Sequence, residues 1–293
     1  MSQIKALGID LAKNIFELKG FDEANRTIYR KRVKRAVFLQ TVVQLDADII
    51  YMEACGGAHH WARSLEVLGV AVELLPPHRV KAFCRGNKND SNDAEAIILA
   101  GVQPSVRRVA IKTLEQQDIQ SLHRVREQVK QQAVALSNQV RGLLAEYGVV
   151  IAKSKTAFRQ GIPEVLGDAE NGLTDRLRAL VNDQWQAFRQ LDNQLKQYDN
   201  DLKTLTAQID DCRRLEQVEG IGPQTATAFY ASLGDAKKFK NGREVSAWLG
   251  LVPKQHASGE TQHLGGITKR GDRYLRTLLI HGARAMVWHA AKM

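Results

Sequence analysis

The sequence predicts a mixed α/β domain followed by a mostly helical region. Over roughly the first 110 residues, short runs of strand-forming residues alternate with segments whose apolar residues have helical spacing. From about residue 113 onward, long segments place an apolar residue at every third or fourth position. Alternating strands and helices form an α/β sheet, whereas long apolar stripes of this spacing are typical of packed helices.

The length and composition suit a globular protein of about two domains. Of the 293 residues, 44% are hydrophobic, which is enough to build sizeable cores. The net charge of +10 and the pI near 9.6 indicate a polyanionic partner, because clustered Lys and Arg displace the counterions of phosphates. Most of the excess lies at the end of the chain, where residues 236–293 carry 11 Lys or Arg against 3 Asp or Glu.

Cysteine usage and hydropathy indicate the compartment. Cys55, Cys84 and Cys212 lie far apart and form no C-x-x-C pair, so neither a zinc site nor a disulfide framework is indicated. The N-terminus shows no leader with a basic and then an apolar part, and no apolar stretch reaches about 18 residues without charge. We therefore expect a cytoplasmic protein that is neither secreted nor membrane-spanning.

The first strand is predicted within residues 4–12, a near-continuous apolar run that carries a lone carboxylate, Asp10. Such a run fits a strand that is covered on both faces of a sheet. Further strands are expected at residues 15–21, 26–33, 47–52 and 70–75, with helices at 36–45, around 61–68 and after residue 90. This β-β-β-α-β-α-β-α order is that of a ribonuclease-H-like domain, in which an antiparallel trio continues into parallel strands through helical crossovers.

Four acids stand where that fold could build a metal site. Asp10 ends the first strand and Glu53 ends the fourth, and these two strands are neighbours in the predicted sheet. Asp90 and Asp93 are three residues apart, on the same side of a first helical turn. Together the four carboxylates would hold two divalent cations that assist in-line attack on phosphorus. Each acid taken singly could instead cap a turn or a helix.

The middle of the chain predicts two long helices. One apolar stripe runs from Leu122 to Tyr147, and a second, from Phe188 to Ile209, has the heptad spacing of a coiled coil. A segment rich in Gly, Pro and Asn, residues 161–174, predicts a loop between them. The second stripe could pack within the chain or between subunits, and the pattern leaves both possibilities open.

The last region combines glycines, basic residues and a serine. Residues 215–226 predict a helix-hairpin-helix unit, in which Gly220 and Gly222 let backbone N–H groups approach a phosphate, although a plain turn between helices fits as well. A glycine-rich loop then places Ser258 among cations that could hold a phosphate, namely Lys254, Lys269, Arg270 and Arg273. A Ser-Gly pair is more often a simple turn than a nucleophile. The final helix shows no stop signal before Met293, which suggests a truncated chain.

Together these segments resemble the DEDD transposases of the insertion-sequence one-hundred-and-ten type, which are bridge-RNA-guided recombinases. The resemblance covers the whole chain and rests on the combination of short motifs. They are Gly8-Ile9-Asp10, Glu53 before Gly56-Gly57, the K-x-D-x-x-D-A run at 88–94, the G-I-G-P hairpin at 220–223, the G-L-V-P at 250–253, Ser258-Gly259 and the basic run at 268–276. Members of that family usually continue for several more helical turns.

The resemblance implies three regions: a RuvC-like domain at 1–110, a helical coiled-coil region at 111–212 and a transposase domain at 213–293. It implies that Asp10, Glu53, Asp90 and Asp93 bind two Mg²⁺ ions, for which Mn²⁺ can substitute, and that Ser258 attacks the scissile phosphate. Nucleic-acid contacts are expected at Gly220, Gly222, Lys254, Lys269, Arg270, Arg273 and Arg276. The expected partners are DNA, a noncoding bridge RNA and further copies of the chain, in a dimer or tetramer associated with the bacterial nucleoid.

Other protein classes predict different features. A RuvC-type structure-selective endonuclease would use the four acids with water as the nucleophile and would not need Ser258. An ATPase of the sugar-kinase or actin type shares the first-strand G-I-D, but it requires Gly or Thr directly after the aspartate, and residues 11–14 read Leu-Ala-Lys-Asn. A non-catalytic nucleic-acid scaffold would use the acids as caps, and it would bind divalent metal no better than background.

Overall fold

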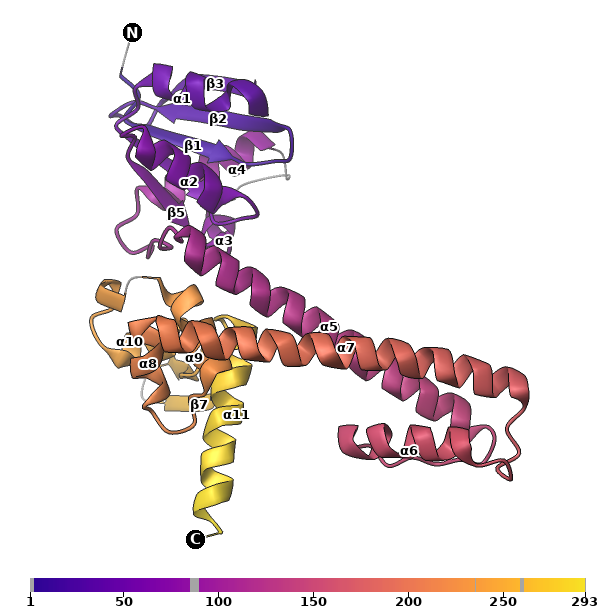
Figure 1. Ribbon diagram of the computed structural model, residues 1–293. Coiled ribbons are helices and arrows are strands. Elements are labelled where there is room, and N and C mark those ends of the chain that lie inside the picture. Colours follow the sequence, from indigo (N-terminus) through magenta and orange to yellow (C-terminus); the bar gives the residue numbers. More distant parts are fainter. Residues whose placement is uncertain (1–2, 85–89, 235, 259–260, 293) are drawn as a thin grey trace. The chain divides into compact units, whose positions relative to one another are not determined.

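The computed structural model describes residues 3–84, 90–234, 236–258 and 261–292, without the side chains of residues 90 and 91 (Figure 1). The chain divides into two compact units, residues 1–113 and 114–293.

The first unit is built on a five-stranded mixed sheet with the strand order β3-β2-β1-β4-β5. Its strands are β1 (Ala6–Asp10), β2 (Ile15–Phe21), β3 (Thr27–Lys34), β4 (Ile49–Glu53) and β5 (Val72–Leu75). β1, β2 and β3 form an antiparallel meander, while β1, β4 and β5 run parallel. The predicted antiparallel trio with parallel extension is therefore confirmed, and it is the strand arrangement of a ribonuclease-H-like sheet.

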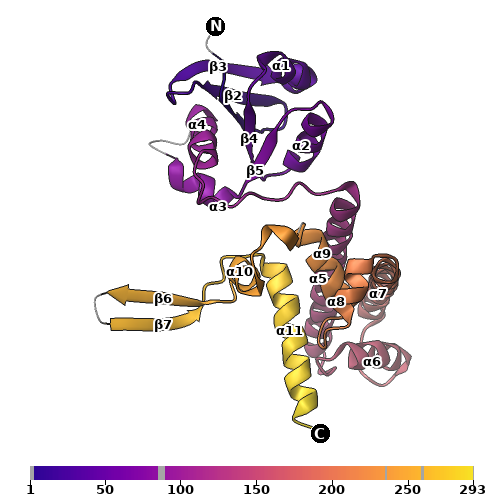
Figure 2. The same cartoon turned by 90° about the vertical axis from the view of Figure 1, so that its left-hand side faces the viewer.

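Helices cover both faces of this sheet (Figure 2). On one face lie α1 (Phe38–Leu45) and α2 (Ala58–Val67), and on the other lies α4 (Asp90–Gly101). The short elements are η1 (Arg35–Val37), α3 (Pro77–Val80) and η2 (Lys81–Phe83). The α1 and α2 face is centred on Phe16, Phe38 and Trp61, whose rings meet edge to face at 4.7–5.4 Å. With a core on each face, the central strand β1 is buried on both sides, as its apolar run predicts.

The second unit is dominated by two long helices, α5 (Leu114–Ala145) and α7 (Asp175–Gln208), which cross and pack against each other (Figure 1). The remaining elements are α6 (Lys155–Gly167), α8 (Asp210–Glu216), α9 (Pro223–Leu233), η3 (Ala236–Lys238), α10 (Gly242–Trp248), β6 (Pro253–Ser258), β7 (Thr261–Ile267) and α11 (Arg273–Ala290). Among the residues that the structure describes, no helix has both the length and the apolar character needed to cross a membrane.

The heptad stripe of α7 is buried within the chain along much of its length. Phe188, Leu195 and Leu202 expose 3%, 6% and 1% of their surface, and the first two join residues of α5 and α6 in one core. Packing within the chain thus accounts for these positions without a second subunit.

Two expected loops are regular elements instead. Residues 161–167 belong to α6, although Pro163 lies inside this helix. The helix persists because Phe158 and Ile162 are fully buried against α5 and α7, and because Lys155 and Arg159 pair with the buried Asp192 of α7. The segment around Ser258 is the β6–β7 hairpin, whose strands pair in antiparallel register.

Candidate active site

Asp10 and Glu53 stand at the carboxyl ends of adjacent parallel strands. β1 and β4 pair with Ile9 opposite Met52, so the next residue of each strand is the acid. Both acids are half-buried. The sheet thus brings together the first two predicted acids.

The side chains of both acids lie on the face of the sheet that α4 covers. A Cβ atom at Gly8 would come within 2.4 Å of the Ala94 carbonyl oxygen, so Gly8 lies directly beneath α4. Asp10 is two residues further along β1 and shares this face, because side chains alternate along a strand. On β4, Tyr51 packs against Gly101 of α4. Glu53 lies two residues further along β4 and therefore shares the face of Tyr51. Only a residue without a side chain at position 8 allows α4 to approach this closely.

The charges around two thiols show that Asp93 joins this neighbourhood. Burial raises the pKa of the Cys84 thiol, and the charge of Asp93, a hydrogen bond to it and the charge of Glu53 raise it further. The Cys84 Sγ lies 3.7 Å from Asp93 Oδ1. Burial also raises the pKa of Cys55, with added contributions from the charges of Glu53 and Asp10. The charge of Glu53 therefore acts on both thiols, of which Cys55 also feels Asp10 and Cys84 contacts Asp93.

The acids whose side chains are described do not converge on a single metal position. Among the described residues, no group of three His, Cys, Asp or Glu side chains is arranged to hold a metal ion. The fourth predicted ligand, Asp90, begins α4, but its side chain lies outside the described residues. Carboxylate oxygens from three elements are the ligand type that Mg²⁺ prefers, so the donor chemistry fits this ion.

The sequence reasoning missed a buried acid beside Asp10. Glu17 of β2 stands directly opposite Asp10 in the register and exposes only 4% of its surface. It accepts hydrogen bonds from the Nε atoms of Arg30 and Arg32, at 3.0 and 2.9 Å. Next to it on the same face, Lys19 forms an ion pair with Glu95 of α4. The signal was present in the alternation of β2, which carries Glu17 and Lys19 among apolar residues.

Ser258 does not lie among the cations predicted to surround it. It ends β6 and pairs with Thr261, at the far end of the hairpin. At about 3.3 Å per residue, Lys254 is roughly 13 Å back along the strand. Lys269 donates its backbone N–H to the Gly250 carbonyl beside the other end of the hairpin, near α10 and α11 (Figure 2). The prediction of one serine and cation cluster within the chain was therefore wrong, because a loop was assumed where the segment is extended.

The predicted nucleic-acid residues differ in their surroundings. The exposed cations of the set are Lys254, Lys269, Arg270 and Arg273. Arg276 is instead buried, and its guanidinium donates to the carbonyl oxygens of Leu249 and Gly271, at 3.0 and 3.1 Å. Arg276 holds the turn before α11 in place, so its assignment as a nucleic-acid contact needs correction.

The two glycines of the G-I-G-P hairpin have separate explanations. Gly220 has φ +82°, and a Cβ there would come within 3.0 Å of the carbonyl oxygen of Gly282 in α11. A Cβ at Gly282 would in turn come within 2.0 Å of the Gly220 carbonyl oxygen. Gly220 is thus required for a close helix contact. A Cβ at the exposed Gly222 would meet no described atom within 4 Å. The role of Gly222 in binding phosphate remains a prediction.

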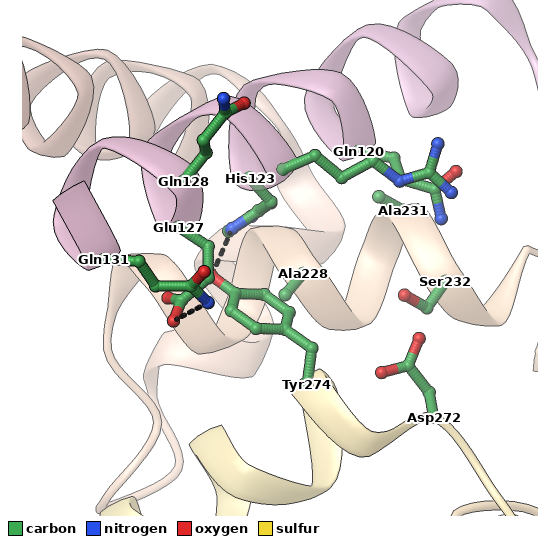
Figure 3. A pocket seen from close by; sticks show the side chains of 11 residues that line it. Gln120, His123, Glu127, Gln128, Gln131, Ala228, Ala231, Ser232, Asp272 and Tyr274 are labelled. Carbon is green, nitrogen blue, oxygen red and sulfur yellow. Dashed lines mark hydrogen bonds between the residues drawn. The ribbon is translucent and has the colours of Figure 1, made fainter.

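A pocket of about 320 Å³ lies between α5, α9 and α11 in the second unit (Figure 3). At its floor, the Nδ1 and Nε2 atoms of His123 lie 3.0 Å from the Tyr274 and Thr227 hydroxyl oxygens. Gln224 donates to the same Tyr274 hydroxyl at 2.9 Å. Burial lowers the pKa of His123 from 6.5 to about 4, and the nearby charge of Arg126 adds to this effect. The neutral imidazole therefore ties three helices together.

Comparison with known proteins places this architecture. The first unit has a mixed sheet with acids at the ends of β1 and β4, and residues 7–149 match the transposase model DEDD_Tnp_IS110. Residues 212–293 match the model of the transposase IS116/IS110/IS902 family.

Curated relatives agree over nearly the full chain. The transposase for insertion sequence element IS1111A of Coxiella burnetii is 43% identical over 289 residues, which are 99% of this chain and 79% of that protein. A probable family 20 transposase of Pseudomonas aeruginosa is 44% identical, over 97% of this chain and 84% of that protein. The transposase for IS1328 of Yersinia enterocolitica is 35% identical, with the same two coverages. The chain belongs to the IS116/IS110/IS902 family of transposases and is an insertion-sequence enzyme of this type.

Proposed function

We propose that this transposase cuts and rejoins DNA strands with Asp10, Glu53, Asp90 and Asp93 as ligands of two Mg²⁺ ions and Ser258 as the nucleophile. The observation that carries the proposal is the alignment of Asp10 with Glu53 on the face that α4 covers, with Asp93 in the first turn of that helix. Acids this close repel one another, so a cation between them lowers the cost of keeping them ionised.

In the proposed reaction, the Ser258 hydroxyl loses its proton to a base while Oγ forms a bond to phosphorus. The bond from phosphorus to one deoxyribose oxygen breaks, and that oxygen takes a proton from water and leaves as a hydroxyl. Bound Mg²⁺ would supply charge neutralisation at the phosphate. The serine-DNA phosphodiester keeps the energy of the original bond. A second DNA hydroxyl can therefore attack this phosphorus and release the Ser258 hydroxyl without ATP.

The position of Ser258 bears on how the site is assembled. Every described residue of the hairpin except Ile267 is exposed, and a two-stranded hairpin alone has marginal stability in water. We propose that it docks on the acid face of another copy in a dimer or tetramer, with DNA and a noncoding bridge RNA between the copies. The coiled-coil role of α5 and α7 and the helix-hairpin-helix role of residues 215–226 belong to the same proposal.

One observation favours a second candidate. Because Ser258 lies far from the cations at the base of its own hairpin, the acids could act alone with water, as in a structure-selective endonuclease.

Two variants separate the candidates. Asp10→Ala should abolish cleavage in Mg²⁺ and should leave the melting temperature in EDTA unchanged or raised, since one of several close anions is gone. Ser258→Ala should bind DNA normally but lose both cleavage and joining, and the wild type should leave a protein-DNA adduct that survives SDS. Wild-type cutting by Asp10→Ala would contradict the acid site. Wild-type cutting by Ser258→Ala would favour the endonuclease.

A further inference from the structure

The edge strand β3 presents a row of cations on the acid face of the sheet. Its alternate residues Tyr29 and Val33 pack into the core beneath α1 and α2. Arg30 and Arg32 therefore lie on the opposite face, and their register partners are Lys19 and Glu17. The side chains of these arginines remain 58% and 64% exposed.

The buried carboxylate of Glu17 holds the two guanidinium groups in place. Its side chain exposes only 3%, and each carboxylate oxygen accepts from one arginine Nε. Two guanidinium groups thus share one buried carboxylate. A buried, paired carboxylate fixes the rotamers of both arginines, whereas an arginine on an open surface loses conformational entropy when it binds.

The same register joins this trio to the acids. Arg32, Glu17 and Asp10 lie opposite one another on β3, β2 and β1, and Glu53 continues the row on β4. Since neighbouring strands lie about 4.8 Å apart, the Cα atom of Arg32 is roughly 10 Å from the Cα atom of Asp10. Since a DNA strand advances about 3.4 Å per nucleotide along the helix axis, this separation corresponds to a few nucleotides.

We propose that Arg30 and Arg32 form a binding site for a phosphate of the DNA strand that is cut, a few nucleotides from the reacting phosphate, with Glu17 as their positioning residue. The proposal rests on the proposed function of the acids and adds the direction in which the strand leaves them, toward the β3 edge of the sheet. Guanidinium groups suit this task because their planar set of donors matches phosphate oxygens.

The strand offers a matched control for the test. Lys31 lies between the two arginines in sequence, is exposed, and has Leu18 of the α1 and α2 core as its register partner, so it belongs to the opposite face. Arg30→Gln, Arg32→Gln and Lys31→Gln each remove one positive charge from the same strand. Binding of a fluorescent DNA oligonucleotide is measured by anisotropy in EDTA over a range of salt concentrations, and the melting temperature of each variant is recorded.

Each arginine variant should bind DNA roughly tenfold more weakly, and the slope of log affinity against log salt should fall by about 0.7–0.9, as for one lost phosphate contact. Lys31→Gln should change both quantities far less. Equal effects of all three substitutions would mean general charge attraction and would overturn the site. A loss seen with an RNA oligonucleotide of the same sequence but not with DNA would overturn the assignment to the cut strand.

Glu17→Gln gives a second, independent readout. The variant is one charge more positive, so a merely repulsive Glu17 predicts tighter DNA binding and equal or faster cleavage. A positioning Glu17 predicts a lower kcat in Mg²⁺ despite the added charge, and failure to see this would remove Glu17 from the proposal. Because binding is measured in EDTA, it is independent of cleavage. If the Asp10→Ala test contradicted the acid site, the effect of the arginine variants on DNA binding could therefore still be interpreted.

Discussion

His123 shows how one buried side chain makes folding depend on pH. The Thr227 hydroxyl lies 2.7 Å from the Pro223 carbonyl and donates to it, so the hydroxyl oxygen accepts from His123 Nε2. His123 Nδ1 is then the acceptor for the Tyr274 hydroxyl. All partners are satisfied with a neutral ring, and protonation would remove one of these bonds within an enclosed site.

We expect the second unit to lose stability as the pH falls from 6.5 toward 4. Over this range the unfolded chain binds a proton at His123, whereas the folded chain, with a pKa of about 4, does not. The linkage amounts to about 3 kcal/mol at the lower limit. His123→Gln should flatten this part of the profile in urea unfolding, while His281→Gln, at an exposed position of α11, should leave it unchanged. Parallel profiles for wild type and His123→Gln would contradict the assignment.

Gly8 and Gly142 offer a direct test of close packing. Gly8→Ala should destabilise the first unit by about 1–3 kcal/mol, because the new Cβ would overlap the Ala94 carbonyl and lift α4 from β1. Moving α4 also moves Asp93, so cleavage should fall by more than stability alone explains. Gly142→Ala, in the last turn of α5 with no described atom within 4 Å of its Cβ, should instead stabilise by about 0.5 kcal/mol. Thermal melts and a cleavage assay on both variants measure these effects.

At the scale of elements, the sequence predicted what local patterns encode. The strands and helices of residues 1–101 follow from apolar runs broken by Gly and Pro, and the structure places them within a few residues of the prediction. Helix α6 was missed because Pro163 and the glycines near it favour a loop locally. The helix is stabilised by residues far away in the sequence, namely the apolar residues of α5 and α7 and the carboxylate of Asp192 in α7. The β6–β7 hairpin was missed because its strands lack the alternation of apolar and polar residues that marks a half-buried strand. Nearly all of its described residues are exposed, so neither face packs on a core.

The stripe of α7 yields a prediction that compares two positions of one helix. Leu195→Asp would place a charge in the core shared by α5, α6 and α7, at a cost of about 3 kcal/mol or more. Leu180→Asp makes the same substitution at a residue that is 52% exposed and should cost little. Urea unfolding would measure both, with light scattering to follow the mass. A folded Leu195→Asp protein of reduced mass would show that the stripe joins subunits rather than helices of one chain.

For the whole molecule, the two functional regions differ in how far the sequence could define them. The position of Asp10 beside Glu53 could be predicted from strand order, because parallel strands bring their carboxyl ends to one edge. The surroundings of Ser258 could not, since they depend on whether a polar segment is a compact loop or an extended ribbon. Likewise, Glu17 and its arginines became visible only through the register of three strands, which spacing along the chain does not specify.

The proposed docking of Ser258 on another copy predicts complementation between two inactive proteins. Asp10→Ala and Ser258→Ala should each fail to cut DNA alone. If acids and serine come from different copies of a dimer, random mixing gives half mixed dimers, and each contains one intact site and one doubly defective site. Cleavage should then recover to about a quarter of the wild-type level, because half of the dimers carry one of two sites. A mixture of Asp10→Ala with Asp10→Ala/Ser258→Ala is the matched control and should remain inactive. If both groups came from a single chain, no intact site could form in any mixture, and the absence of recovery after co-refolding would exclude a composite site between copies.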